Sequence, residues 1–177
     1  MIIRILINLF LIVLVTVFQL AFINNLPAWF GQFSLIIVIL IFSLEFGQSR
    51  KIIWWFLLVG FLFDIYSPLF FGLWLCFWPV VFLFAKFLSV NFFTNKSLYS
   101  FLGLGFFTTL FYYFFFHLIF YILNIMASKS IVFFLLFKNF YINLLSGLIF
   151  NLLAVFVLFY IINFISDKLK PVFLFKK

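Results

Sequence analysis

The chain has 177 residues, of which 69% are hydrophobic and 36 are phenylalanine, with 11 lysines and arginines and only 3 acids. A water-soluble domain is about 45–50% apolar and about 25% charged, so this composition excludes the soluble, disordered and fibrous classes. The net charge of +8 does not indicate nucleic acid, because the cations lie singly between apolar runs and form no basic face.

Six apolar runs follow one another along the chain and predict an all-α integral membrane protein, a bundle of about six transmembrane helices. A spanning helix needs about 20 apolar residues, or about 17 at least. The predicted spans are residues 5–23, 30–46, 52–65, 69–88, 98–123 and 139–165, within one transmembrane domain covering 1–177. The first run is expected to stay as an uncleaved helix, because no small-residue cleavage site follows it. The third is short, and a re-entrant half-helix is its alternative.

The cations favour six spans over five. With the N-terminus inside, nine cations fall on the inner side: Arg4, Arg50, Lys51, Lys86, Lys96, Lys168, Lys170, Lys176 and Lys177. Only Lys129 and Lys138 fall outside. Cytoplasmic loops carry an excess of Lys and Arg, so we expect a multi-pass protein of the cell (plasma) membrane with both termini in the cytoplasm.

Polar residues inside the predicted spans are candidates for function, because burying them in the bilayer is costly. Asn8 and Gln19 share one face of the first span at helical spacing. The last span carries a similar stripe: Asn143, Ser146, Gly147 and Asn151. Small and amide residues let helices approach and hydrogen-bond, which favours helix packing. The alternatives are a docking face for another membrane protein or a polar ligand cavity.

The chain offers no residue set for catalysis. A proton relay through His117 would need acids at the same depth, whereas Glu45, Asp64 and Asp167 lie at predicted helix ends. There is no zinc motif, paired carboxylate or Cys/His pair in the sequence. We therefore expect no enzyme activity, no metal and no cofactor. The single cysteine, Cys76, lies in an apolar run and is expected to be buried and inert.

The turn between the third and fourth spans is the most informative stretch. Asp64 ends the third span, and Ser67 and Pro68 are good residues with which to start a helix. An anion there would cap the fourth helix by accepting hydrogen bonds from its free amides. Gly60, one turn earlier, permits close helix approach. The alternative role for Asp64 is pairing with a cation on a partner protein.

The pattern G-x-x-x-D-x-x-S-x-x-x-x-G, formed by Gly60, Asp64, Ser67 and Gly72, resembles the signature turn of the MreD family of rod shape-determining proteins. Chain length, six spans, cytoplasmic ends and short second and third helices are also similar to that family. The resemblance implies a non-catalytic scaffold of the cell-elongation complex, which binds MreC and helps organise peptidoglycan synthesis. We refer to residues 60–72 as the signature turn.

The family's architecture is similar to that of the substrate-binding S-components of energy-coupling-factor vitamin transporters, which supplies the alternative function. Such subunits dock through small residues on the first helix, and this chain has no alanine or glycine before Ala21. The expected outer loops offer few polar groups for a vitamin: Asn24, Asn25, Asp64, Ser67, Ser128 and Lys129. The scaffold is therefore favoured.

Overall fold

The computed structural model describes residues 2–27, 30, 32–46, 49–67, 70–95, 97–126 and 140–174. These residues form helices and connecting turns, with no strand among them. In chain order the helices are α1 (Ile2–Ala21), the short 3-10 helix η1 (Ile23–Asn25), α2 (Leu35–Phe46), α3 (Ser49–Tyr66), α4 (Leu73–Asn91), α5 (Leu98–Met126) and α7 (Phe140–Leu174).

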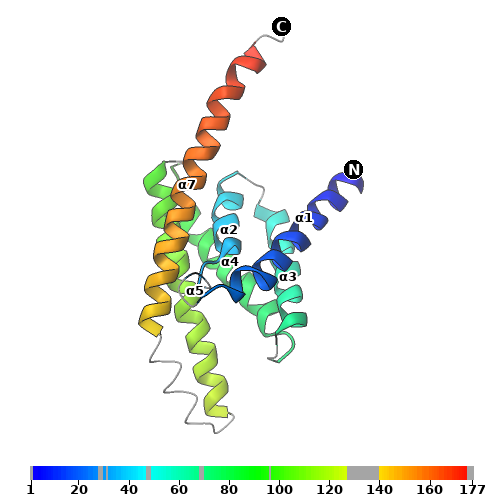
Figure 1. Ribbon diagram of the computed structural model, residues 1–177, viewed down its shortest axis with the longest axis vertical. Helices are drawn as coiled ribbons and strands as arrows, with labels where there is room; N and C mark the ends of the chain where they lie inside the picture. The colour runs from blue at the N-terminus through cyan, green and yellow to red at the C-terminus, as the bar shows by residue number, and fades with distance from the viewer. Residues whose placement is uncertain are drawn as a thin grey trace.

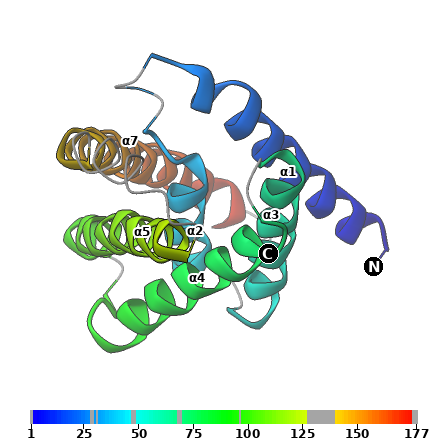
Figure 2. The same cartoon turned by 90° about the horizontal axis from the view of Figure 1, so that it is seen from below.

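Helix α2 lies at the centre of the fold, where it packs against α1, α3, α4, α5 and α7. The long helices α5 and α7 run side by side, α3 and α4 form a hairpin, and α1 crosses the outside of α3 (Figures 1 and 2). The α3–α4 turn and the start of α7 lie at the lower end in Figure 1, and the start of α1 and the end of α7 lie toward the upper end.

The sequence of α2 explains its central place. It is apolar on every side, and Ile36, Ile37, Val38, Leu40 and Ile41 are all buried. A helix that is hydrophobic all round is stable only where other elements or lipid surround it. Its 12 residues make it about 18 Å long. The buried residues all lie within its first seven positions, whereas Phe46 at its end is exposed.

Aromatic side chains fill the space between α3, α4 and α5. Phe77 and Trp78 of α4 are almost fully buried. Phe77 packs against Phe115 and Tyr112, with ring centroids 5.3 Å apart in each pair. Trp78 lies 5.6 Å from both Phe63 of α3 and Tyr112 of α5. Offset and edge-to-face pairs of this kind stabilise a fold beyond the area they bury.

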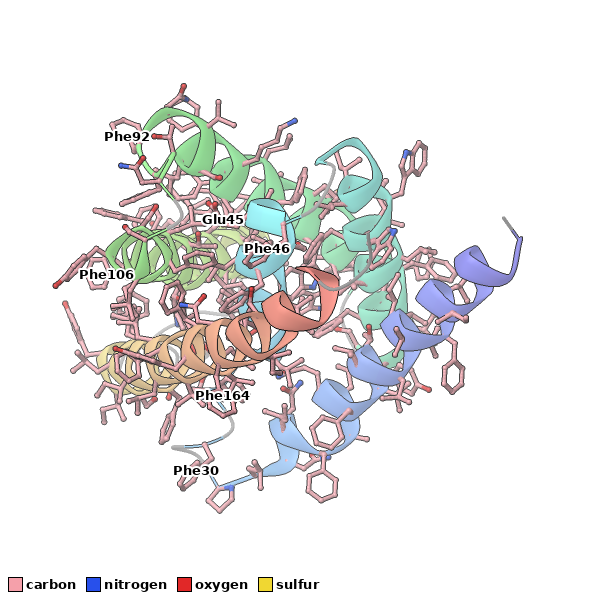
Figure 3. The ribbon with its side chains drawn as sticks, turned by 90° about the horizontal axis from the view of Figure 1, so that it is seen from above. Phe30, Glu45, Phe46, Phe92, Phe106 and Phe164 are labelled. Carbon is pink, nitrogen blue, oxygen red and sulfur yellow. The ribbon has the colours of Figure 1, made fainter. Side chains whose placement is uncertain are left out.

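The outer surface is also apolar. Phe92, directly after α4, Phe106 of α5 and Phe164 of α7 project away from the bundle (Figure 3). Three segments are long and apolar enough to cross a membrane: Leu73–Asn91, Leu98–Leu123 and Phe140–Ser166. Three others are apolar but shorter: Leu9–Asn25, Leu35–Phe46 and Ile52–Tyr66. A helical membrane protein accounts for a surface of this kind, because lipid takes the place of water around it.

The start of the second helix and the exposure of Cys76 differ from the predictions, each for a local reason. The second helix begins at Leu35 and not at residue 30, because Phe30 and Phe33 are engaged in turns, with Phe33 N–H bonded to Phe30 O. The apolar part of the last helix, Phe140–Ser166, agrees with the predicted span 139–165. The helix itself continues to Leu174, because the charged residues after 165 are compatible with a helix that leaves the apolar zone. Cys76 is exposed, because it lies on the outer side of α4 with Val80 and Leu83.

Candidate functional site

Asp64 caps α4 from outside that helix. Its side chain is only 4% exposed. Oδ1 accepts a hydrogen bond from the backbone N–H of Trp74, and Oδ2 accepts one from Leu75, each at 2.9 Å. These donors belong to the first turn of α4, whose N-cap residue, Gly72, has no side chain with which to cap it. The carboxylate of α3 therefore performs the capping role that the sequence suggested.

The other free amides of this helix end are also satisfied. Leu73 N–H donates to Phe70 O, and Cys76 N–H donates to Gly72 O. The expectation that Ser67 and Pro68 open the fourth helix is wrong, because the chain first makes a turn that ends at Gly72. That glycine has a φ of 97°, a left-handed conformation that residues with a Cβ adopt at a cost. Ser67 is half-buried, and Pro68 lies outside the described residues.

Gly60 packs directly against the backbone of the first turn of α4. A Cβ at this position would lie 2.5 Å from the carbonyl oxygen of Trp74 and 2.8 Å from the Cα of Leu75. Both obstacles are backbone atoms, so they cannot move without moving the helix. The absence of a side chain at Gly60 is what allows Asp64, one turn later, to reach the first turn of α4.

A second buried helix end, that of α2, is capped by side chains of α1 and α7. Gln19 Oε1 accepts from Leu35 N–H, and Asn151 Oδ1 accepts from Ser34 N–H, each at 2.9 Å. Gln19 Nε2 donates to Phe33 O and to Asn24 Oδ1. Both amide side chains are almost fully buried, so they bond within the bundle and do not face a partner.

The rest of the α7 stripe is divided between packing and a cavity. Ser146 Oγ donates to carbonyl groups of its own helix. Gly147 lies against the hydroxyl of Tyr113, which passes it and donates to Gln32 O at 2.8 Å. Asn143 is half-buried and lines the cavity described below. The side chain of Asn8 lies outside the described part of the chain.

We expect Asn151→Leu to lower the free energy of unfolding by about 1–2 kcal/mol, because the buried N–H of Ser34 then lacks an acceptor. Chemical denaturation in detergent, followed by circular dichroism, measures this change. Asn163→Leu is the matched control, since Asn163 lies on the same helix and is exposed. An equal loss for both substitutions would contradict the capping role of Asn151.

A cavity of about 530 Å³ lies between the two capped helix ends. The described residues that line it come from α1 and η1, the segment before α2, the end of α3, and α4, α5 and α7. They are Gln19, Leu20, Asn24, Gln32, Phe33, Ser34, Phe63, Tyr66, Ser67, Trp74, Trp78, Tyr112, Tyr113, Phe116, His117 and Asn143. The volume is within the range of small-molecule sites, about 300–1,000 Å³. Figure 2 looks toward this end of the bundle.

The hydrogen bond of His117 defines its free nitrogen. Nδ1 lies 2.9 Å from the carbonyl oxygen of Tyr113, and only a protonated nitrogen can donate to a carbonyl. In the neutral ring, Nε2 is then an acceptor. The ring also packs edge-on against Phe140. Among the described residues, His117 thus makes one hydrogen bond, through Nδ1, and its Nε2 has no partner.

The described residues contain no group of three or more His, Cys, Asp or Glu that could hold a metal ion. The sequence offered a polar ligand cavity only as an alternative for the stripes that contain Gln19 and Asn143, and it did not indicate the other walls, which come from distant parts of the chain. Comparison of the chain with protein-family models, with curated proteins and with solved structures gave no match.

Proposed function

We propose that the chain crosses the membrane six times, with both termini in the cytoplasm. Three helices have spanning length and composition, and the apolar segments at α1, α2 and α3 are shorter. The start of α1 and the end of α7 lie toward one end of the molecule (Figure 1), as an even number of spans requires. The excess of cations on the same side supports this orientation.

Reporter fusions test the topology. A reporter that is active only in the cytoplasm should be active when fused after Lys177 and inactive when inserted beside Asn25. Cysteine labelling from outside the cell, on Asn25→Cys in a Cys76→Ser background, gives an independent measurement. Labelling at Asn25 is expected only with the proposed orientation, and the reverse pattern in both assays would contradict it.

We propose that the protein is a non-catalytic membrane scaffold of the cell-elongation complex and binds an MreC-like partner. The observation that supports this role is the geometry of the signature turn, residues 60–72. Gly60 permits backbone contact, Asp64 satisfies two amides, and Gly72 adopts a left-handed φ. Three positions of the pattern thus meet three separate requirements of one turn, which favours a true resemblance to the MreD family over a chance match.

Co-purification tests the partner. The tagged chain and the MreC-like protein from the same genome should be recovered together from detergent-solubilised membranes, and an unrelated single-span protein at equal expression should not be. Cross-linking in intact membranes repeats the measurement without detergent. Failure to recover the MreC-like protein in both assays would overturn the scaffold proposal.

A second candidate is a substrate-binding subunit similar to the S-components of vitamin transporters. The observation in its favour is the 530 Å³ cavity, which combines aromatic walls with amide and hydroxyl groups. Vitamin binding to the purified chain, together with capture of an energy-coupling transmembrane subunit and not of the MreC-like protein, would favour this candidate.

A further inference from the structure

We propose that the cavity between α1, α3, α4, α5 and α7 binds an uncharged, flat ring compound that carries hydroxyl or amide groups. The inference rests on the cavity alone, so it can fail while the scaffold proposal stands. It also supplies the class of ligand that the second candidate function would need.

The charge of the lining restricts the ligand. The described lining residues include no Asp, Glu, Lys or Arg. An ion that leaves water for a site with no counter-charge is strongly disfavoured. Asp64 lies nearby, but both of its carboxylate oxygens are occupied by the amides of α4. A neutral ligand is therefore selected.

The walls of the cavity favour a ring. Trp74 and Phe116 stack with centroids 5.5 Å apart, and Trp78 and Tyr112 lie 5.6 Å apart. These side chains come from α4 and α5 and present large, rigid, apolar surface to the cavity. Pockets with such walls hold a flat ligand by contact over its faces, and a few polar groups fix its orientation.

Unengaged polar groups converge on the cavity from three parts of the chain. The side-chain amide of Asn143 on α7 makes no hydrogen bond within the described part of the chain, nor does Nε2 of Gln32 in the segment before α2. His117 on α5 adds its free Nε2. In contrast, Gln19 uses all of its hydrogen-bonding groups within the fold. The amide nitrogens of Asn143 and Gln32 can donate to a ligand, and the amide oxygen of Asn143 and Nε2 of His117 can accept from it. Ligand hydroxyl and amide groups need partners of both kinds.

The same wall contains two buried donors without acceptors among the described residues, the indole N–H groups of Trp74 and Trp78. Buried polar groups are paired in the great majority of cases, so each exception asks for an explanation. A ligand oxygen that enters after a small movement of these rings would pair with one of them. Tryptophan fluorescence should then report binding.

Matched pairs of neutral and charged probes test the inference. The purified full chain in detergent is titrated with nicotinamide and nicotinate, and with benzamide and benzoate, at neutral pH. Equilibrium dialysis measures affinity, and tryptophan fluorescence and thermal stabilisation follow binding. The neutral member of at least one pair should bind, at least roughly tenfold more tightly than its anion.

Variants locate the site. Asn143→Leu should weaken binding of the neutral probe by about threefold to tenfold, because one hydrogen bond to the ligand is lost. Gln32→Met tests the opposite side of the cavity in the same way. Asn163→Leu makes the same chemical change as Asn143→Leu on an exposed part of α7 and should leave affinity unchanged. Binding of none of the probes, equal affinity for the anions, or affinity unchanged in both Asn143→Leu and Gln32→Met would overturn the proposal.

Discussion

Gly60→Ala should lower the free energy of unfolding by about 3 kcal/mol, because overpacking against atoms that cannot yield typically costs 1–3 kcal/mol or more. The new Cβ would lie 2.5 Å from Trp74 O and 2.8 Å from Leu75 Cα. To relieve these contacts, α3 and α4 must separate, which breaks the hydrogen bonds from the first turn of α4 to Asp64. Chemical denaturation in detergent measures the change. We expect an apparent melting temperature lower by roughly 6–12 °C.

Gly105→Ala is the matched control. A Cβ at Gly105 would meet Leu152 Cδ2 at 3.4 Å and Ile41 Cδ1 at 3.5 Å, which are ordinary contacts with the ends of flexible side chains. Alanine also favours a helix over glycine by up to about 1 kcal/mol. The substitution should therefore be neutral or stabilising. Equal destabilisation by both substitutions would show that the bundle resists any added methyl group and that Gly60 has no special place.

The apolar runs predict where helices lie, because each membrane-spanning helix needs such a run whatever its neighbours are. Helix ends are less predictable. The first turn of α4 depends on the left-handed Gly72 and on a carboxylate ten residues earlier in the chain. The sequence suggests Asp64 as a cap, since an acid at a helix end is a local signal. It does not show that Trp74 and Leu75 are the amides it binds.

The amide residues show the same limit. Helical spacing places Asn143 and Asn151 on one stripe of α7, and polar residues in apolar helices indicate hydrogen bonding. Their different roles depend on α2, whose N-terminus reaches Asn151 but not Asn143. The cavity is still less predictable, because its lining comes from six separate parts of the chain. Only the packing of α2 against α5 and α7 brings Gln32 near Tyr113.

Asp64→Leu should lower the free energy of unfolding by about 3 kcal/mol, because two buried N–H groups lose their acceptor and each unpaired donor costs about 1–3 kcal/mol. Asp64→Asn should cost about half as much, since one of the two accepting oxygens is replaced by an NH2 group, which cannot accept from a backbone amide. It also loses the favourable charge at the N-terminus of α4. Chemical denaturation of the three proteins in detergent should give the stability order Asp, Asn, Leu.

Glu45→Gln controls for the loss of a carboxylate elsewhere in the fold. Glu45 accepts one hydrogen bond, from Ser89 Oγ at 3.1 Å, and it is only half-buried. Glutamine keeps an acceptor for that hydroxyl, so its effect on the free energy of unfolding should be smaller than that of Asp64→Asn.

Partner capture separates the capping role of Asp64 from recognition of a partner's cation. If Asp64 is a cap, the folded fraction of Asp64→Asn should still bind the MreC-like protein, because the buried carboxylate contributes nothing to the outer surface. If Asp64 pairs with a cation, Asn and Leu should abolish capture equally while the stability of the isolated chain hardly changes. Two N–H donors at 2.9 Å and an exposure of 4% leave no carboxylate oxygen facing outward, which favours the cap.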